Sequence, residues 1–121
     1  MKLSGRPLSL DNIAAVAYGR ESVQIAGSAR ARILASRKVV DGIIGRDAVV
    51  YGVNTGFGKL ADVRIPRAEI GALQLNLVRS HACGIGPPLS EAETRAMMLL
   101  RANVLALGFS GVRPEDRKSV V

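Results

Sequence analysis

Residues 51–58, Tyr-Gly-Val-Asn-Thr-Gly-Phe-Gly, divide the chain, because helical patterns lie on both sides of them. The stretch holds three glycines and two of the four aromatic residues in the chain. Glycine accepts positive φ and lets a backbone approach a ligand closely. A glycine-rich loop beside a phenol is therefore a candidate site loop. A second interpretation stays open, in which the stretch is a long turn whose Tyr51 and Phe57 fold back onto the core.

Helical and extended patterns precede this loop. Ser9 or Asp11 can cap a first helix over residues 12–18. Residues 22–26 alternate polar and apolar side chains, which favours a short strand. A longer helix is expected over residues 28–44, with the serine at its start as N-cap.

Two further helices are expected after the loop. Pro66 fits the first position of a helix that runs to about Ser80. A loop rich in Gly and Pro follows, and Ser90 and Glu93 then form a capping box for a helix over residues 91–107. The expected buried stripe of this last helix is Ala96, Leu99, Leu100, Val104 and Leu107.

The composition favours one mainly α-helical domain over residues 1–121. A chain of 121 residues with 48% hydrophobic residues and a mean hydropathy of +0.21 is not a disordered chain. Aromatic residues make up only 3%, and the apolar material is mostly Ala, Val, Leu and Ile, which suits helices packed closely on helices. Residues 1–7 and 114–121 carry no periodic pattern, so we expect them to fray.

The net charge of +7 raises nucleic acid as a partner. The basic residues are spread along the chain, however, and no run of them exceeds two. The tightest cluster is expected on the solvated face of one helix and consists of Arg30, Arg32, Arg37 and Lys38. We therefore expect no nucleic-acid partner.

The single cysteine and the single histidine limit the possible sites. Cys83 cannot form an intrachain disulfide, which indicates a reducing compartment, and it is expected to be a small buried hydrophobe. With only His81 beside it, no zinc site is expected. No apolar run reaches the ~18 residues of a membrane span, and no signal peptide is recognisable. We expect a cytoplasmic protein without a membrane partner.

Tyr51 and His81 are the candidate functional side chains. A phenol acts as a base near neutral pH only where positive charge or a helix N-terminus stabilises the phenolate; otherwise Tyr51 is a buried tyrosine with a hydrogen-bonded hydroxyl. His81 stands at a helix end, where it either serves a site or caps the last carbonyls. The glycine loop is neither a Walker A motif nor a dinucleotide-binding fingerprint, because its glycines have the wrong spacing.

Three stretches together resemble the N-terminal region of the aromatic amino acid ammonia-lyases. They are YGVNTGFG at 51–58, LQLNLVRSHACGIG at 73–86 and RANVLALGFSGVR at 101–113, in the order and spacing of the family. The histidine ammonia-lyases are the most similar members, and tyrosine ammonia-lyases and related aminomutases are also similar. The resemblance implies the N-terminal domain of the fumarase/aspartase-like helical fold, mainly α with short β segments.

The resemblance also implies an activity. Members of this family eliminate ammonia from an amino acid and leave an α,β-unsaturated acid. Tyr51 would be the catalytic base that removes a β-proton, and Gly58 would line the substrate pocket. His81 would be a substrate-binding position that suits a polar ring. The substrate would be histidine, giving urocanate and ammonia; the alternative is tyrosine, in an ammonia-lyase or an aminomutase.

One departure from the family limits this expectation. The electrophile of the family is a methylidene-imidazolone that forms from an internal Ala-Ser-Gly, and no Ala-Ser-Gly occurs in these 121 residues. We therefore expect no cofactor in this chain and no activity of the chain alone. We expect self-association or pairing with the missing C-terminal lyase region. A non-catalytic binding module that keeps the lyase fold is the alternative.

Overall fold

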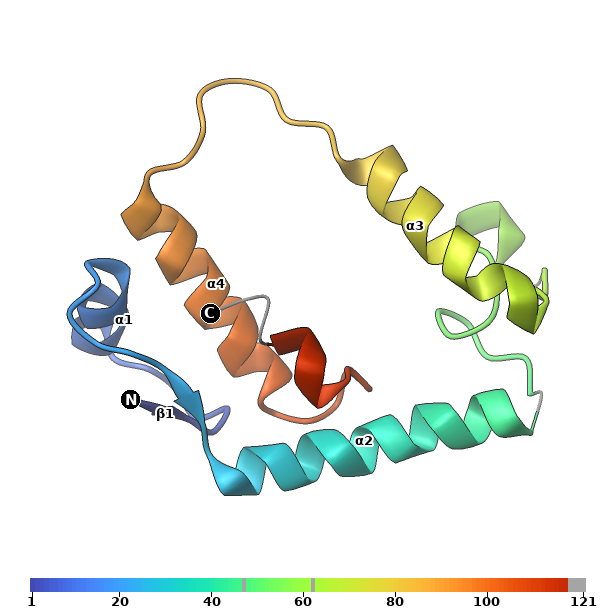
Figure 1. The fold of residues 1–121 in the computed structure, drawn as a ribbon, viewed down its shortest axis with the longest axis horizontal. Helices are drawn as coiled ribbons and strands as arrows, with labels where there is room; N and C mark the ends of the chain where they lie inside the picture. Colours follow the sequence, from blue (N-terminus) through green and yellow to red (C-terminus); the bar gives the residue numbers. More distant parts are fainter. Residues whose placement is uncertain (47, 62, 118–121) are drawn as a thin grey trace. The chain divides into compact units, whose positions relative to one another are not determined.

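The chain folds into two compact units (Figure 1). The computed structural model describes residues 1–46, 48–61 and 63–117. The first unit combines Met1–Val39 with Pro88–Val121, and the second is Val40–Pro87. The described residues form four α-helices and one two-stranded sheet, which confirms the expected mainly α fold with short β segments. A single domain over the whole chain stays a prediction.

The first unit begins with a paired strand. β1 (Lys2–Leu3) lies parallel to β2 (Gln24–Ile25), within the segment expected to be a strand. The ammonium group of Met1 pairs with the carboxylate of Glu21 at 2.6 Å, and Leu3 is fully buried. The start of the chain therefore differs from the fraying expected for residues 1–7, because backbone pairing and a buried leucine hold it in place.

Side-chain caps fix the starts of α1 (Leu10–Ala17) and α4 (Glu91–Leu105). Ser9 caps α1 through a reciprocal pair of hydrogen bonds with the residue three positions on. At α4, the carboxylate of Glu93 accepts from the amide of Ser90 at 2.8 Å, and the Ser90 hydroxyl accepts from the amide of Glu93 at 3.3 Å. These bonds satisfy amides that have no partner inside the helix. These two expected caps are confirmed, whereas Ser28, the cap expected for the helix over 28–44, lies inside that helix, which begins at Gly27.

α1 and α4 pack against each other around a small core. Of the stripe expected on α4, only Leu99 is buried, whereas Leu100 and Val104 are 46% and 52% exposed. The expectation was wrong because α4 is apolar on two sides, and spacing alone does not tell which side faces inward. The buried cluster of the first unit consists of Leu3, Val16, Ala29, Leu99, Ala102 and Ala106.

α2 (Gly27–Gly45) carries Arg32, whose side chain joins separate segments of the first unit through hydrogen bonds. The Arg32 guanidinium donates to the carbonyl of Ser4 at 2.6 Å, of Ala106 at 3.0 Å and of Leu107 at 3.2 Å. The last carbonyls of a helix have no partner within the helix, so Arg32 caps α4 from outside. Arg32 is exposed, as expected of a residue on the solvated face of this helix, and its guanidinium bonds these carbonyls in addition.

Asn103 and Gly108 complete this junction. The Asn103 side chain accepts from the amide of Gly5 at 3.2 Å and donates to the carbonyl of Arg6 at 2.9 Å. Gly108 has a φ of +84°, and a Cβ there would lie 2.6 Å from the Cβ of Arg32 and 2.9 Å from its carbonyl carbon. Only glycine fits this position, because both the backbone and the space exclude a side chain.

The second unit contains α3 (Ile70–His81) and two single 3₁₀ turns, Gly58–Leu60 and Arg67–Glu69. The helix expected from Pro66 therefore begins as a 3₁₀ turn and becomes α-helical at Ile70. Leu75 and Val78 on this helix are 51% and 66% exposed. α3 thus presents apolar side chains to solvent.

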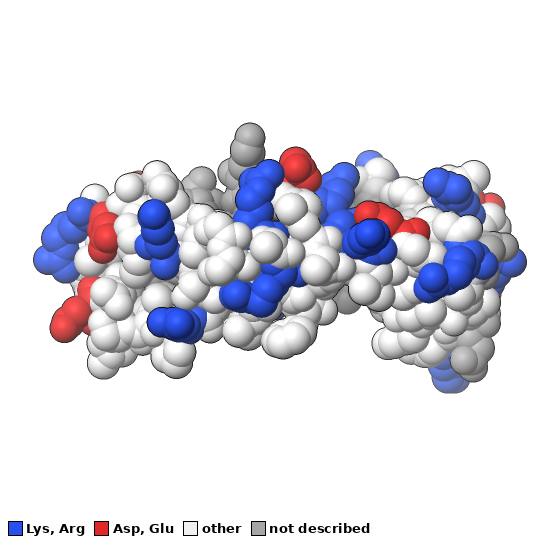
Figure 2. Space-filling model, turned by 90° about the horizontal axis from the view of Figure 1, so that it is seen from below, with Lys and Arg blue, Asp and Glu red and all other residues white. Residues whose placement is uncertain are grey.

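Charged side chains are dispersed over the face shown in Figure 2, where Lys and Arg alternate with uncharged and acidic residues. This distribution agrees with the spread of basic residues along the sequence. No helix in the described ranges has the length and hydropathy to cross a membrane.

Substituting Gly108 by alanine should destabilise the first unit. We expect a loss of roughly 2–4 kcal/mol, since the change adds left-handed backbone strain and a clash with Arg32. Gly27→Ala is the control, because a Cβ at Gly27 meets nothing within 4 Å. Urea unfolding followed by circular dichroism measures both, and equal midpoints for the two variants would contradict the packing described here.

The cap of α4 should respond to pH. Hydrogen bonds from the Ser90 hydroxyl and then from its amide stabilise the carboxylate, and they lower the pKa of Glu93 below its ordinary value. Because the folded pKa is the lower one, this stabilisation is present above the unfolded pKa and is lost as pH falls through the folded pKa.

The difference in unfolding free energy between the wild-type chain and Glu93→Gln should therefore shrink as pH is lowered from about 6 to about 3. Urea unfolding across this range measures it. Glu91→Gln is the control for the loss of a carboxylate in this turn, because it removes a surface pair with Arg95 and leaves the cap intact. A pH-independent difference for Glu93→Gln would refute the role of the cap.

Candidate functional site

The glycine loop is built around the buried side chain of Asn54. Asn54 is 4% exposed; its Nδ2 donates to the carbonyl of Ala48 at 2.8 Å, and its Oδ1 accepts from the amide of Val50 at 3.0 Å. The amides of Val53 and Asn54 both donate to the carbonyl of Val50, at 3.1 and 3.3 Å. The side-chain amide therefore holds the residues that lead directly into Tyr51.

This arrangement sets the conformation of residues 48–51, the apolar segment that leads into the loop. The segment forms no strand, and Val49 and Tyr51 are 56% and 63% exposed. The physical reason is local: the backbone groups of this segment find partners on the Asn54 side chain rather than on a neighbouring strand.

A short antiparallel contact holds the far side of the loop. Thr55 and Arg64 form an isolated bridge, the amide of Gly56 donates to the carbonyl of Val63 at 3.0 Å, and the amide of Ile65 donates to the carbonyl of Asn54 at 3.0 Å. Thr55 is 1% exposed. The loop is therefore fixed from both sides, which gives it a defined shape for a site.

Tyr51 and Phe57 contact each other edge to face at the rim of this loop. Their ring centroids are 6.3 Å apart with an interplanar angle of 73°, a geometry that aromatic pairs favour. Tyr51 is 63% exposed and Phe57 is 36% exposed, so the rings do not fold back into a core. The interpretation of the loop as a turn with buried aromatics is wrong, and the phenol of Tyr51 is accessible.

Gly52 and Gly58 give the loop its shape. Their φ values are +76° and +59°, which glycine accepts without strain. No heavy atom lies within 4 Å of the place where a Cβ of Gly58 would stand. The surface at Gly58 is therefore open, as a pocket wall requires, and its contact with a substrate stays a prediction.

His81 ends α3 and points one ring nitrogen at its own helix. Nδ1 lies 2.8 Å from the carbonyl oxygen of Leu77 and 3.0 Å from the hydroxyl of Ser80. A carbonyl oxygen only accepts, so Nδ1 carries the hydrogen of this contact. This carbonyl precedes the last four of the helix, which are the ones that a cap serves, so the expected capping is not what His81 does; the contact leaves Nε2 as the nitrogen that a ligand can meet, since His81 is exposed.

The loop after His81 differs from expectation at Cys83. The thiol of Cys83 is exposed rather than buried, and Ile85 is fully exposed as well. The described residues 82–90 are all exposed and form no regular structure, so this segment has no packed interior in which the Cys83 thiol could be buried.

The predicted site residues Tyr51, Gly58 and His81 all belong to the second unit. Tyr51 and Gly58 share the glycine loop, whereas His81 stands at the end of α3. Within the described residues, no hydrogen bond or ring contact joins His81 to Tyr51. The described part of the chain also contains no group of three His, Cys, Asp or Glu side chains that could hold a metal ion.

Asn54 is the site residue that sequence reasoning missed. It lies inside the glycine loop, between the glycines and aromatics that mark the loop in the sequence. The available signal was an asparagine shortly after an apolar segment, because asparagine side chains often bond a nearby backbone in turns.

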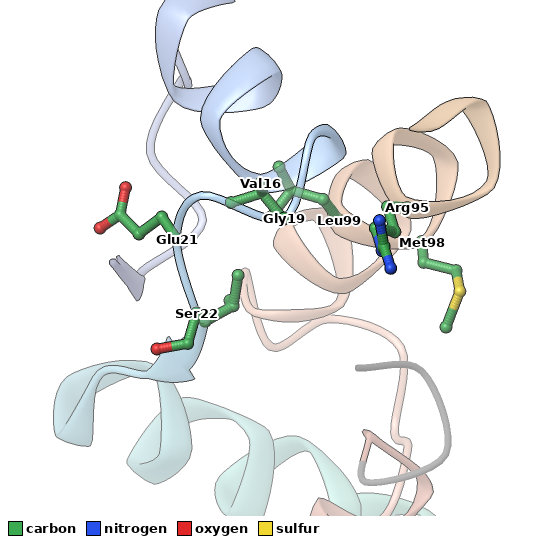
Figure 3. A pocket seen from close by; sticks show the side chains of 8 residues that line it. Val16, Gly19, Glu21, Ser22, Arg95, Met98 and Leu99 are labelled. Carbon is green, nitrogen blue, oxygen red and sulfur yellow. The ribbon is translucent and has the colours of Figure 1, made fainter. Parts of the chain in front are cut away.

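A cavity of about 290 Å³ lies in the first unit, between α1, the following turn and α4 (Figure 3). Its charged groups already have partners: Arg95 pairs with Glu91 at 3.0 Å, and Glu21, whose carboxylate points away from the cavity, pairs with the ammonium of Met1. None of the predicted site residues lines it. The lining consists of Val16, Gly19, Glu21, Ser22, Val23, Arg95, Met98 and Leu99.

Comparison with known proteins gives consistent matches. The family model described as "Aromatic amino acid lyase" matches residues 8–120. A histidine ammonia-lyase from Sorangium cellulosum is 57% identical over 93% of this chain, which covers 23% of that protein. The crystal structure of histidine ammonia-lyase from Trypanosoma cruzi matches with a TM-score of 0.89 and 40% identity over 98% of this chain and 23% of the other.

A tyrosine aminomutase from Streptomyces globisporus also has this fold, with a TM-score of 0.90 and 34% identity over 99% of this chain and 23% of the other. The chain thus spans less than a quarter of the length of these relatives and corresponds to their N-terminal part.

Replacing Asn54 by alanine should loosen the glycine loop. It removes the acceptor of the Val50 amide and the donor to the Ala48 carbonyl, at a cost of about 1–3 kcal/mol for the partners left unsatisfied. Amide hydrogen exchange of Val50 should therefore accelerate about tenfold or more. Asn76→Ala, on the exposed surface of α3, is the control. Unchanged protection at Val50 would contradict the role of Asn54.

Proposed function

The chain belongs to the aromatic amino acid lyase family, and we propose that it supplies the base loop of a histidine ammonia-lyase. The observation that carries the proposal is the position of Tyr51. Its ring stands 63% exposed on a loop that Asn54 holds from within, and its hydroxyl has no hydrogen-bond partner among the described residues. An accessible phenol on a fixed support can reach a substrate, and the proposal requires that the remaining part of the lyase supplies the positive charge or helix N-terminus that stabilises the phenolate.

In the proposed reaction, Tyr51 takes a proton from the β-carbon of the amino acid as phenolate. The electron pair of the C–H bond forms the double bond between the α- and β-carbons, and the bond from the α-carbon to nitrogen breaks, so that ammonia leaves with its electron pair. Histidine then gives urocanate. Phe57, at 6.3 Å from the Tyr51 ring, limits the orientations of the phenol.

His81 is proposed to contact the side chain of the substrate. With Nδ1 held by the carbonyl of Leu77, Nε2 can accept a hydrogen bond from an imidazole or a phenol. This supports histidine as the substrate, as the name of the Sorangium relative suggests. Tyrosine is the second candidate, because the same chemistry of His81 fits a phenol and a tyrosine aminomutase shares the fold.

The residues of this chain do not provide the electrophile of the family. A methylidene-imidazolone forms from Ala-Ser-Gly, and the 121 residues contain no such triplet. We therefore propose that the chain is inactive by itself and acts with the remaining part of a lyase. The large exposed side chains of α3, Leu75 and Val78, at 51% and 66% exposure, support a partner of this kind.

The missing triplet also favours the second function that we consider, a non-catalytic binding module with the lyase fold. For both functions we propose a cytoplasmic protein, on the ground that Cys83 is a free, exposed thiol. Neither function involves nucleic acid, since the basic side chains are dispersed on the face of Figure 2.

The experiment is a complementation assay. The purified chain is mixed with the Sorangium lyase polypeptide from which the matching region has been removed, and urocanate formation from histidine and coumarate formation from tyrosine are followed. We expect no turnover by the chain alone and turnover of histidine by the mixture. Tyr51→Phe should lower that turnover by about 10²–10⁴-fold, the usual contribution of a general base.

Tyr18→Phe is the matched control, because Tyr18 is also exposed, at 68%, but lies in the first unit. It should leave turnover unchanged. Full turnover with Tyr51→Phe would rule out Tyr51 as the base, and turnover by the chain alone would contradict the proposed need for a partner. An inactive mixture of two folded, bound polypeptides would favour the binding module.

A further inference from the structure

α4 presents a second apolar face on the side opposite its buried one. Leu99, Ala102 and Leu105 are buried against the rest of the first unit, at 3%, 0% and 8% exposure. The outer face of α4 consists of Met97, Leu100 and Val104, which are 59%, 46% and 52% exposed. A helix that is apolar on both sides is normally buried on both sides.

The spacing of the outer face indicates what covers it. Met97, Leu100 and Val104 follow each other at intervals of three and four residues, which places them in one row along the helix. A narrow row with this repeat is the seam that one helix offers to another helix. A partner helix therefore fits the outer face better than a sheet or a small ligand.

The outer face is also preformed. Ser90 and Glu93 fix the start of α4, and Arg32 bonds the carbonyls of Ala106 and Leu107 at its end. A surface that is already held in its bound shape loses little conformational freedom when a partner docks.

Charge distinguishes the possible partners. Arg101 lies beside the outer face, is exposed, and has no ion-pair partner among the described residues. A second copy of this chain would bring another Arg101 and a further net charge of +7 to the contact, and like charges disfavour such a pair. A helix with an acidic residue beside its apolar row complements Arg101.

We propose that the outer face of α4 is the docking site for an amphipathic helix from the part of the lyase that lies outside this chain, with an acidic side chain opposite Arg101. The inference rests on the proposed function and identifies where that partner binds. The fold of this chain recurs within relatives more than four times as long, with TM-scores of 0.89 and 0.90. The remaining part of such a relative is long enough to provide a helix that covers the outer face.

The test measures binding rather than turnover. The Sorangium lyase polypeptide without its matching region is immobilised, and the dissociation constant of the full 121-residue chain is measured by interferometry. Leu100→Glu and, as a second variant at the most exposed position of the face, Met97→Lys should each weaken binding at least tenfold. Leu10→Glu, at an 84% exposed leucine of α1, should change it less than twofold. Circular dichroism confirms that each variant is folded.

Two further variants separate this inference from the proposed function and from a self-associating chain. Tyr51→Phe should bind as tightly as the wild-type chain, whatever it does to turnover. Arg101→Glu should weaken binding, and Arg101→Lys should preserve it. Undiminished binding by folded Leu100→Glu and Met97→Lys, or no binding by the wild-type chain, would overturn the proposal. So would a dimer of the chain alone, seen by sedimentation, that Leu100→Glu dissociates.

Discussion

The first unit depends on one guanidinium group. Arg32 reaches from α2 to the end of α4 and to the carbonyl of Ser4, so it joins segments that are 28 to 75 residues apart in the sequence. The buried cluster of this unit is small and half of it is alanine, so polar contacts add to what its packing contributes. Hydrogen bonds to a charged group contribute up to about 1.5–3 kcal/mol each, and because Arg32 is exposed its bonds contribute less than that. Gly108 permits the contact because it has no side chain to hold α2 and α4 apart.

In the second unit, too, one polar side chain bonds backbone groups of other residues, over a shorter stretch of the chain. The side-chain amide of Asn54 makes the hydrogen bonds to the Ala48 carbonyl and the Val50 amide that a neighbouring strand would otherwise make. A strand pair would have placed Tyr51 in a pleated row with its side chain packed on a sheet. The turn around Asn54 instead turns the phenol outward, where its ring meets that of Phe57. Burial of a polar amide in the loop thus accompanies the exposure of the aromatic ring that the proposed base requires.

Contacts between residues a few positions apart could be predicted from the sequence, whereas contacts between residues far apart in the chain could not. The caps at Ser9 and Ser90, the short strand before α2 and the glycine loop follow from neighbours within a few residues, and all are present. The role of Arg32 depends on carbonyls 74 and 75 residues away, and no periodicity encodes such a contact. The inward face of α4 was misassigned for a related reason: two apolar faces give no preference until α1 and β1 occupy one of them.

The two faces of α4 connect stability to assembly. Full burial of a Leu, Val or Met side chain contributes about 1.5–3 kcal/mol, and the three residues of the outer face are each about half exposed, so covering them would add roughly 2–4 kcal/mol. That is a large share of the stability of a small domain. A partner that binds only the folded unit stabilises it by mass action. The outer face is presented only when the caps and Arg32 hold α4, so docking and folding of this unit favour each other.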